Sequence, residues 1–421
     1  MRSRKRASLR PREIGILFVA SLAALAIIAI LLSADVRMSS LAPGGGSFFS
    51  AWNGAREFLF LHQDPYGAAS AAAAQQLAYG AAPTGIADPD RLSLPFYLLP
   101  FVFPLAVIPD PNAARGVWAL LSQGSLIGAI FLTMGVIDWR APRTFVVVFS
   151  LLMLFSFYSV IALAEGSLAI ILVLAYMGIL WAMQSRQDEL AGALIALSLC
   201  MWEVGLPFLI LVTWRVFREN RWRIVAGLAM TLVILLLISF LVYPGWFLPF
   251  LTASIGMIRA PHGISASAAL VGLWPQHGAQ IARGLSVVVL SVLVYEAAAG
   301  RDSDFRRFVW TASLALVATP LIGIKTDLSS LVALTPSLVL ITAAALQRSR
   351  AGVWFAAFML VLIIAFPWFL FSQWFVFRDD RGRDLLFLFF PSMSLLGLYW
   401  TRWWFLQPPR TWLDEIRFAR R

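Results

Sequence analysis

Apolar runs of about 20 residues recur along this chain from Gly15 to Trp404, and they constrain its fold more than any other feature of the sequence. A helical run of this length matches the hydrocarbon thickness of a bilayer. Inside a bilayer the backbone N–H and C=O groups must be hydrogen-bonded within the protein, and a helix achieves this within one segment. The chain is therefore predicted to be an all-α, polytopic protein of the cell membrane.

Hydropathy predicts about twelve transmembrane helices, with boundaries accurate to a few residues. The composition agrees, because 60% of the 421 residues are hydrophobic and only 13% are charged. No charged block between the runs is long enough for a soluble domain, so residues 1–421 are expected to form a single transmembrane domain. No internal repeat is visible, which disfavours a transporter built from duplicated halves. The predicted runs are 14–32, 93–109, 113–137, 144–163, 167–184, 190–213, 222–243, 281–298, 307–324, 328–346, 351–373 and 384–404.

The basic residues indicate the orientation of the chain. It carries 33 basic and 22 acidic residues, for a net charge of +11, and its N-terminus is strongly basic before the first run. The positive-inside rule then predicts that the N- and C-termini are cytoplasmic and that residues 34–92 form an extracytoplasmic loop. This basic charge suits anionic membrane lipids as partners better than nucleic acid.

Cysteine and histidine usage gives little indication of a cofactor. The single cysteine, Cys200, cannot form an intramolecular disulfide. The three histidines, His62, His262 and His277, do not stand beside cysteines or carboxylates at metal-ligand spacing. No metal or cofactor is therefore expected, although a divalent cation held by carboxylates remains an open alternative.

The segment Pro43–Tyr66 is the part of the external loop best suited to a site. It opens with three glycines, at positions 44–46, that allow a sharp turn or a close approach to a ligand. An aromatic, amphipathic stretch follows, in which Arg56 and Glu57 are expected to form an exposed pair. Asp64 is expected to cap a short surface helix that ends at Gly80. The alternative interpretation of the segment is an ordinary interfacial helix with its linker.

The order and spacing of several short motifs resemble those of the polytopic glycosyltransferases of family 87. After the first run, family members carry an Asp-Phe pair, an aromatic residue, a small residue followed by Arg, and a Pro-Tyr pair. Further along, they carry an Ala-Arg-x-x-Trp step, a Gly-Gln pair, an Ala-Gly step, a Lys-Pro pair, and a Thr-Pro or Ser-Pro pair followed by an Asp-containing turn. The corresponding positions here are Ser47-Phe48, Trp52, Gly54-Ala55-Arg56, Asp64-Pro65-Tyr66, LPFYLLPFVFPLAVIPDPNAARGVW, Ala164-Glu165, Ala191-Gly192, Trp202-Glu203, Thr319-Pro320 and Lys325-Thr326-Asp327.

This resemblance implies a GT-C fold and an enzyme that moves a sugar from a polyprenyl-phosphate donor to a lipid or glycan acceptor. The family's catalytic base is an aspartate of the first external loop, and Ser47 stands in its place. A serine hydroxyl lacks the basicity to take a proton from an acceptor hydroxyl. Asp35 and Asp64 are the candidate catalytic residues, with a solvated boundary position and a helix cap as their respective alternatives.

The candidate substrate-binding residues share a predicted position at the outer face or inside an apolar run. External arginines can bind a phosphate through two parallel hydrogen bonds, or they can simply anchor the chain to lipid head groups. Carboxylates within an apolar run are costly and are either functional or paired with arginine. The candidates are Ser47, Trp52, Arg56, Tyr66, Glu165, Glu203, Arg259, His262, Lys325 and Asp327.

Two other functions fit the same sequence. The chain could be a GT-C-like protein that has lost catalysis and acts as a lipid-glycan binding or accessory subunit. It could also be a transporter of lipid-linked sugars.

Overall fold

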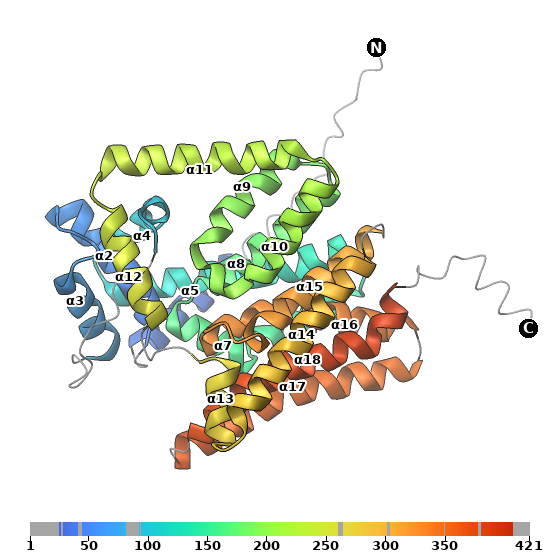
Figure 1. The fold of residues 1–421 in the computed structure, drawn as a ribbon. Helices are drawn as coiled ribbons and strands as arrows, with labels where there is room; N and C mark the ends of the chain where they lie inside the picture. The colour runs from blue at the N-terminus through green and yellow to red at the C-terminus, as the bar shows by residue number, and fades with distance from the viewer. Residues whose placement is uncertain are drawn as a thin grey trace, which may run out of the picture.

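The structure is a computed structural model that describes residues 25–26, 28–40, 44–80, 92, 94–259, 264–300, 304–348, 350–377 and 380–406. Within these ranges the regular structure is helical, apart from one isolated antiparallel bridge between Ile264 and Thr326. Figure 1 shows a bundle of long helices with a group of short helices, among them α2, α3, α4 and α12, gathered at its left. The chain is thus all-α, as the sequence predicts.

The helices have the following bounds, in chain order. Residues 28–40 form the first described helix. Next come α2 (Gly46–Arg56), the π-helical turn η1 (Glu57–Leu61), α3 (Ala68–Tyr79), η2 (Phe96–Phe101), α4 (Phe103–Ala106), α5 (Pro111–Val136), α6 (Arg143–Leu154), α7 (Phe157–Glu165), α8 (Ala169–Gln184) and α9 (Asp188–Ser198). The remainder are η3 (Leu199–Met201), α10 (Trp202–Arg218), α11 (Trp222–Val242), α12 (Phe247–Arg259), α13 (Ala266–Leu273), α14 (Gly278–Ala299), α15 (Phe305–Leu321), η4 (Leu328–Leu334), α16 (Thr335–Arg348), α17 (Arg350–Phe377) and α18 (Asp380–Leu406).

Seven segments of the described residues are long and apolar enough to cross a membrane, and the bent pair α6 and α7 adds an eighth candidate, although one of the seven, Asp188–Arg218, is bent into a hairpin. They support an α-helical membrane protein. The segment 328–347, made of η4 and most of α16, is the most enclosed candidate, with 94% of its apolar window buried inside the protein. The twelve predicted crossings are not confirmed, and two of the predicted runs fold in another way.

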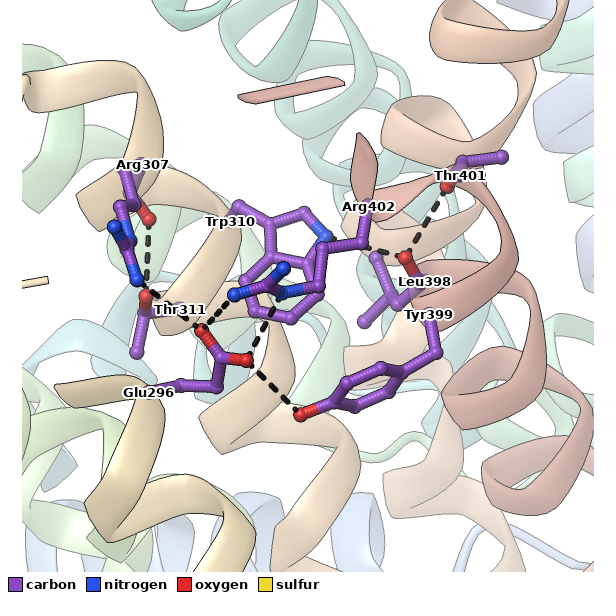
Figure 2. A network of polar contacts seen from close by, with 8 residues as sticks. All are labelled: Glu296, Arg307, Trp310, Thr311, Leu398, Tyr399, Thr401 and Arg402. Atoms are coloured by element: carbon purple, nitrogen blue, oxygen red, sulfur yellow. Dashed lines mark hydrogen bonds and ion pairs between the residues drawn. The ribbon is translucent and has the colours of Figure 1, made fainter. Parts of the chain in front are cut away.

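One end of the bundle, which we name the Glu296 end, is held together by a buried ion-pair network (Figure 2). Glu296 lies near the end of α14 and is only 2% exposed. Its carboxylate accepts two contacts from Arg402 of α18, Nε at 2.9 Å and Nη2 at 3.0 Å. Arg307 of α15 approaches it at 3.6 Å, and the Tyr399 hydroxyl lies at 3.4 Å. Three helices are therefore joined at one point.

Further helix ends meet at the Glu296 end. Arg306, at the start of α15, donates to the Phe405 carbonyl of α18 at 2.8 Å and interacts electrostatically with Asp138, just after α5. Arg215, near the end of α10, lies over the Phe308 ring of α15, 4.4 Å from its centroid. The opposite end, which carries α2, α3, η2 and α4, is named the α2 end.

The predicted crossing at 93–109 is wrong. The Tyr66 hydroxyl donates to the Leu94 carbonyl at 2.9 Å, and the Trp52 indole donates to the Leu105 carbonyl at 3.0 Å. The two ends of the run are therefore bound to the same segment, so the run stays at the α2 end. Four prolines in the run, at positions 95, 100, 104 and 109, prevent a long helix, because each lacks a backbone N–H. The run forms only the short helices η2 and α4.

The predicted crossing at 190–213 is also wrong, because α9 and α10 form a hairpin that returns to the end where it began. A straight helix over the 31 residues Asp188–Arg218 would be about 46 Å long. Yet Arg221, just after this segment, forms an ion pair with Asp188 at its start. It also donates to the Met183 carbonyl at the end of α8, at 3.0 Å. The hairpin enters from the Glu296 end and leaves there, as the slanting helices α9 and α10 of Figure 1 show.

With these two crossings removed, the predicted number of crossings is still even. The helix at 28–40 reaches the α2 end with its last residues, because the Ser39 carbonyl accepts a hydrogen bond from Arg115 near the start of α5. The last described helix, α18, finishes at the Glu296 end, where Arg402 and Phe405 lie. The first described helix therefore runs toward the α2 end and the last runs away from it.

Candidate functional site

The glycine turn before α2 is packed against the side chain of Arg115. Gly44 and Gly45 have φ angles of 133° and 84°, which side-chain-bearing residues rarely adopt. A Cβ atom on Gly45 would lie 2.9 Å from the Arg115 Nε atom. The Gly44 N–H donates to the Ala78 carbonyl of α3 at 2.9 Å. Glycine is therefore required here both by the backbone conformation and by the closeness of the arginine.

Arg115 itself joins three segments that are distant in sequence. It is 4% exposed, near the start of α5. Its guanidinium donates to the Ala164 carbonyl at 2.6 Å and to the Ser39 carbonyl at 3.2 Å. It also interacts electrostatically with Glu165 and Tyr79. The sequence candidates did not include Arg115, although an arginine within the Ala-Arg-x-x-Trp step of an otherwise apolar helix was a usable signal.

Trp118, one turn further along α5, joins the same group. Its indole N–H donates to the Gly166 carbonyl at 3.0 Å, and its ring lies 5.9 Å from that of Phe48. Gly166 has a φ of 65° and presses against the Phe48 backbone and Cβ atom. Glu165, the last residue of α7, is thereby placed beside the glycine turn. The motifs around residues 44–48, 115–118 and 164–166 form one contiguous site, which we name the Arg115 site.

Ser47 lies in the first turn of α2 and is exposed. Asp35 lies on the helix that reaches this site, and its two carboxylate oxygens accept hydrogen bonds from Gln123 Nε2 at 3.0 and 3.1 Å. It precedes Ser39 by one helical turn, about 6 Å along the axis. Asp35 is therefore near the Arg115 site, half-buried and engaged by an amide.

Trp52 and Arg56 attach α2 to the segment before α5. The Trp52 side chain is 4% exposed, and the Arg56 Nη1 atom donates to the Ala106 and Ile108 carbonyls at 2.8 and 3.3 Å. The guanidinium also lies over the Trp52 ring, 4.9 Å from its centroid. Arg56 thus holds backbone carbonyls. The expected exposed pair with Glu57 is wrong, since Glu57 is 8% exposed and accepts a hydrogen bond from Asn53 at 2.9 Å.

Tyr66 and Asp64 shape the turn that follows. The Tyr66 hydroxyl is buried, and burial raises the pKa of this phenol above its usual range, so it remains a neutral donor to Leu94. Asp64 is exposed, and its carboxylate accepts the Tyr66 N–H at 2.9 Å. It therefore caps a turn and does not begin α3, whose N-cap is Gly67. The prediction that α3 ends at Gly80 is confirmed.

Aromatic residues after α11 cover η1 and η2 at the α2 end. The Tyr243 ring lies 5.7 Å from that of Phe58 and 5.6 Å from that of Phe96. Trp246 is 1% exposed and packs edge-on against Tyr97, with ring centroids 6.4 Å apart. Two segments that are far apart in sequence, both predicted to be external, therefore lie together.

The remaining candidates lie around the tip of the α9–α10 hairpin and the loop before η4. Glu203 is in the first turn of α10 and interacts electrostatically with Asp327. Lys325 and Asp327 are exposed on either side of Thr326, which pairs with Ile264 through two backbone hydrogen bonds of 2.9 Å. Arg259 is the last residue of α12, and its side chain lies outside the described part of the structure, as does His262.

The structure thus divides the predicted site residues between two places. Ser47, Glu165 and Asp35 lie at or near the Arg115 site, whereas Glu203 and Asp327 lie near the hairpin tip. Trp52, Arg56 and Tyr66 support the first of these places through their backbone contacts. No protein-family model matches the chain, and no curated protein matches it in sequence.

Proposed function

We propose that the protein is an integral-membrane glycosyltransferase that moves a sugar from a polyprenyl-phosphate donor to a lipid or glycan acceptor at the outer face of the membrane. The observation that carries the proposal is the Arg115 site. Its three segments, 44–48, 115–118 and 164–166, are those in which the sequence resembles the family 87 enzymes. They are distant along the chain, yet they meet through the contacts of Arg115 and Trp118.

In this reaction an acceptor hydroxyl oxygen attacks the anomeric carbon of the sugar. The bond from that carbon to the donor phosphate breaks, and the lipid phosphate leaves with the bonding electron pair. A base takes the proton of the acceptor hydroxyl. Because Ser47 cannot serve as this base, a carboxylate near the Arg115 site is required, and the reaction needs no further oxidant or co-reactant.

Asp35 is the better placed of the two candidate bases. Pro65 packs against Gly54 of α2, so the neighbouring Asp64 lies about two helical turns, roughly 10 Å, along α2 from Ser47. Asp35 lies one helical turn before Ser39, whose carbonyl binds Arg115. We assign the proton transfer to Asp35, with Gln123 orienting its carboxylate.

The test uses purified protein in lipid nanodiscs, supplied with radiolabelled polyprenyl-phosphate sugars and a membrane lipid extract. Loss of a general base lowers rates by about 10²–10⁴-fold, so Asp35→Asn is expected to reduce transfer by at least roughly 10²-fold. Asp64→Asn, the matched control, is expected to leave transfer within about threefold, since Asp64 contacts the Tyr66 N–H and the Tyr243 side chain and no residue of the Arg115 site. Ser47→Asp is expected to preserve or raise transfer. Activity that survives both Asp35→Asn and Asp64→Asn together would show that neither aspartate is the base.

A non-catalytic lipid-glycan binding protein is the second candidate, favoured by the serine at position 47. Under this function, no variant transfers sugar, even Ser47→Asp, whereas the purified protein still retains the labelled donor on a filter. A chain that neither transfers nor retains the donor would exclude both functions.

The orientation of the protein belongs to the same proposal: the Glu296 end and both termini face the cytoplasm, and the α2 end faces outward. A reporter that is active only in the cytoplasm, fused to the C-terminus, is expected to be active. The same reporter inserted after Gly80, next to α3 at the α2 end, is expected to be inactive. The reverse pattern would contradict the orientation.

A further inference from the structure

The tip of the α9–α10 hairpin is exposed at Leu199 and Trp202 but buried at Val204 and Gly205, where it breaks regular helical geometry. Gly205 has non-helical angles (φ −149°, ψ 29°), and a Cβ atom on it would lie 2.6 Å from the hydroxyl of Tyr176, midway along α8. Pro207 has no N–H, so the Glu203 carbonyl lacks its usual helical donor. Such interrupted backbone occurs at membrane depth where it is buried in protein or lines a polar site.

The carboxylates of Glu203 and Asp327 give the tip its negative charge. The helix dipoles add little to it, because the carbonyl end of α9 and the N–H end of α10 meet there with opposite poles. Glu203 contributes a carboxylate, and the charged side chain that acts on it is another carboxylate, Asp327. Lys325 is the nearest basic residue along the chain, and it is exposed beside Asp327. A carboxylate at this depth is expensive unless a positive partner offsets its charge.

A buried hydroxyl adds an independent observation. Tyr176 is 0% exposed, and its hydroxyl has no hydrogen-bond partner among the residues that the structure describes. It points at Gly205 and interacts electrostatically with Cys200 and Glu203. Buried polar groups are nearly always satisfied, so an orphan hydroxyl near a carboxylate that has no basic partner among the described residues indicates a missing partner.

We propose that the hairpin tip binds a monovalent metal cation of the size of Na⁺. Its oxygen ligands are the Glu203 carboxylate, the Tyr176 hydroxyl and backbone carbonyls that the helix interruption at Gly205 and Pro207 leaves without helical donors. The negative charge of Asp327 lies near this site. Interrupted helices of membrane proteins hold Na⁺ through unwound carbonyls and half-helix C-terminal ends. Among the described residues no three His, Cys, Asp or Glu side chains form a group, whereas divalent Ca²⁺ takes six to eight oxygens, often from several carboxylates. This binding is separate from the proposed sugar transfer.

The experiment measures the unfolding temperature of the purified protein in detergent, followed by tryptophan fluorescence. NaCl replaces choline chloride at constant ionic strength, so that only the small cation changes. The unfolding temperature is expected to rise with Na⁺ concentration and to keep rising logarithmically above the Kd, as for any ligand of the folded state. Glu203→Gln is expected to weaken the apparent Na⁺ affinity by about 10-fold or more.

Two further variants make the result decisive. Tyr176→Phe removes one oxygen but keeps the ring that packs 4.9 Å from Phe208, so it tests the site even if Glu203→Gln fails to fold. It is also expected to weaken Na⁺ affinity by about 10-fold. Glu189→Gln, on the exposed start of the same hairpin, is the control and is expected to respond to Na⁺ as the unchanged protein does. An unfolding temperature that is independent of Na⁺, or equally dependent in all three variants, would overturn the proposal, whatever the outcome of the transfer assay.

Discussion

Glu296→Gln is expected to lower the free energy of unfolding by about 2–3 kcal/mol, because the two arginines at the Glu296 end lose their shared anionic partner. Breaking a buried pair by removing one member generally costs about 3–5 kcal/mol. The Arg402 and Arg307 side chains are 29% and 26% exposed, so solvent screens part of their charge and reduces this effect. Equilibrium unfolding in mixed micelles, followed by tryptophan fluorescence, measures the loss.

The matched control is Glu219→Gln. Glu219, the residue just after α10, pairs with Arg215 at 2.7 Å and approaches Arg221 at 3.7 Å, but its side chain is 35% exposed. Such a pair contributes under about 1 kcal/mol. Combining Glu296→Gln with Arg402→Met is expected to recover part of the stability, since one unpaired charge is then absent. Equal losses for Glu296→Gln and Glu219→Gln would show that the network of Figure 2 contributes little.

Gly192→Ala is expected to destabilise the protein by about 3 kcal/mol or more, because α9 and α11 are in backbone contact at this position. A Cβ atom on Gly192 would lie 2.5 Å from the Leu228 backbone nitrogen. The reciprocal contact is just as tight, since a Cβ on Gly227 would lie 2.7 Å from the Glu189 carbonyl oxygen. Small residues at helix crossings in membranes permit such close approach. The unfolding temperature and the yield of folded protein measure the effect.

Gly284→Ala is the control for this substitution. Gly284 lies within α14, and a Cβ atom there would meet nothing within 4 Å. Alanine is the better helix former, so this variant is expected to be unchanged or slightly more stable. If both variants are equally stable, the hairpin is not packed against α11 as closely as described.

Hydropathy was sufficient to predict the all-α class and most of the long helices. The runs at 113–137, 222–243 and 281–298 correspond to α5, α11 and α14 within a few residues. This succeeds because a helix that crosses a bilayer must be apolar over a fixed length, which is a property of one segment alone. The glycine turn before α2 could also be predicted, since a glycine that adopts a positive φ acts locally.

The two wrong crossings failed for a shared physical reason. Hydropathy measures whether a segment prefers an apolar environment, but it does not indicate at which end of the bundle the segment stops. The prolines at 95, 100, 104 and 109, and Pro207 after Gly205, were visible signals of interrupted helices. The contact that shows α9 and α10 to be a hairpin, between Asp188 and Arg221, joins residues 33 positions apart and forms only in the packed fold.

The roles of the arginines were the least predictable part of the site. Arg56 was a candidate for binding a donor phosphate or a lipid head group, and in the structure it binds the carbonyls of Ala106 and Ile108. Arg115 was not a candidate, although it joins the segments around Ser39 and Ala164. The sequence does not show which backbone carbonyls an arginine will meet. An arginine that binds carbonyls can therefore be distinguished from one that binds a ligand only when the fold is known.

The hairpin of α9 and α10 also affects how this protein can change over evolution. A segment that enters and leaves the bilayer from one side does not reverse the direction of the chain. A change in the length of its tip leaves the orientation of α11 and every later helix unchanged, whereas losing any single crossing would invert all of them. The ion pair of Asp188 with Arg221 closes such a unit at its base. The tip that carries Glu203 is therefore a place where a new binding specificity can arise while the later helices keep their orientation.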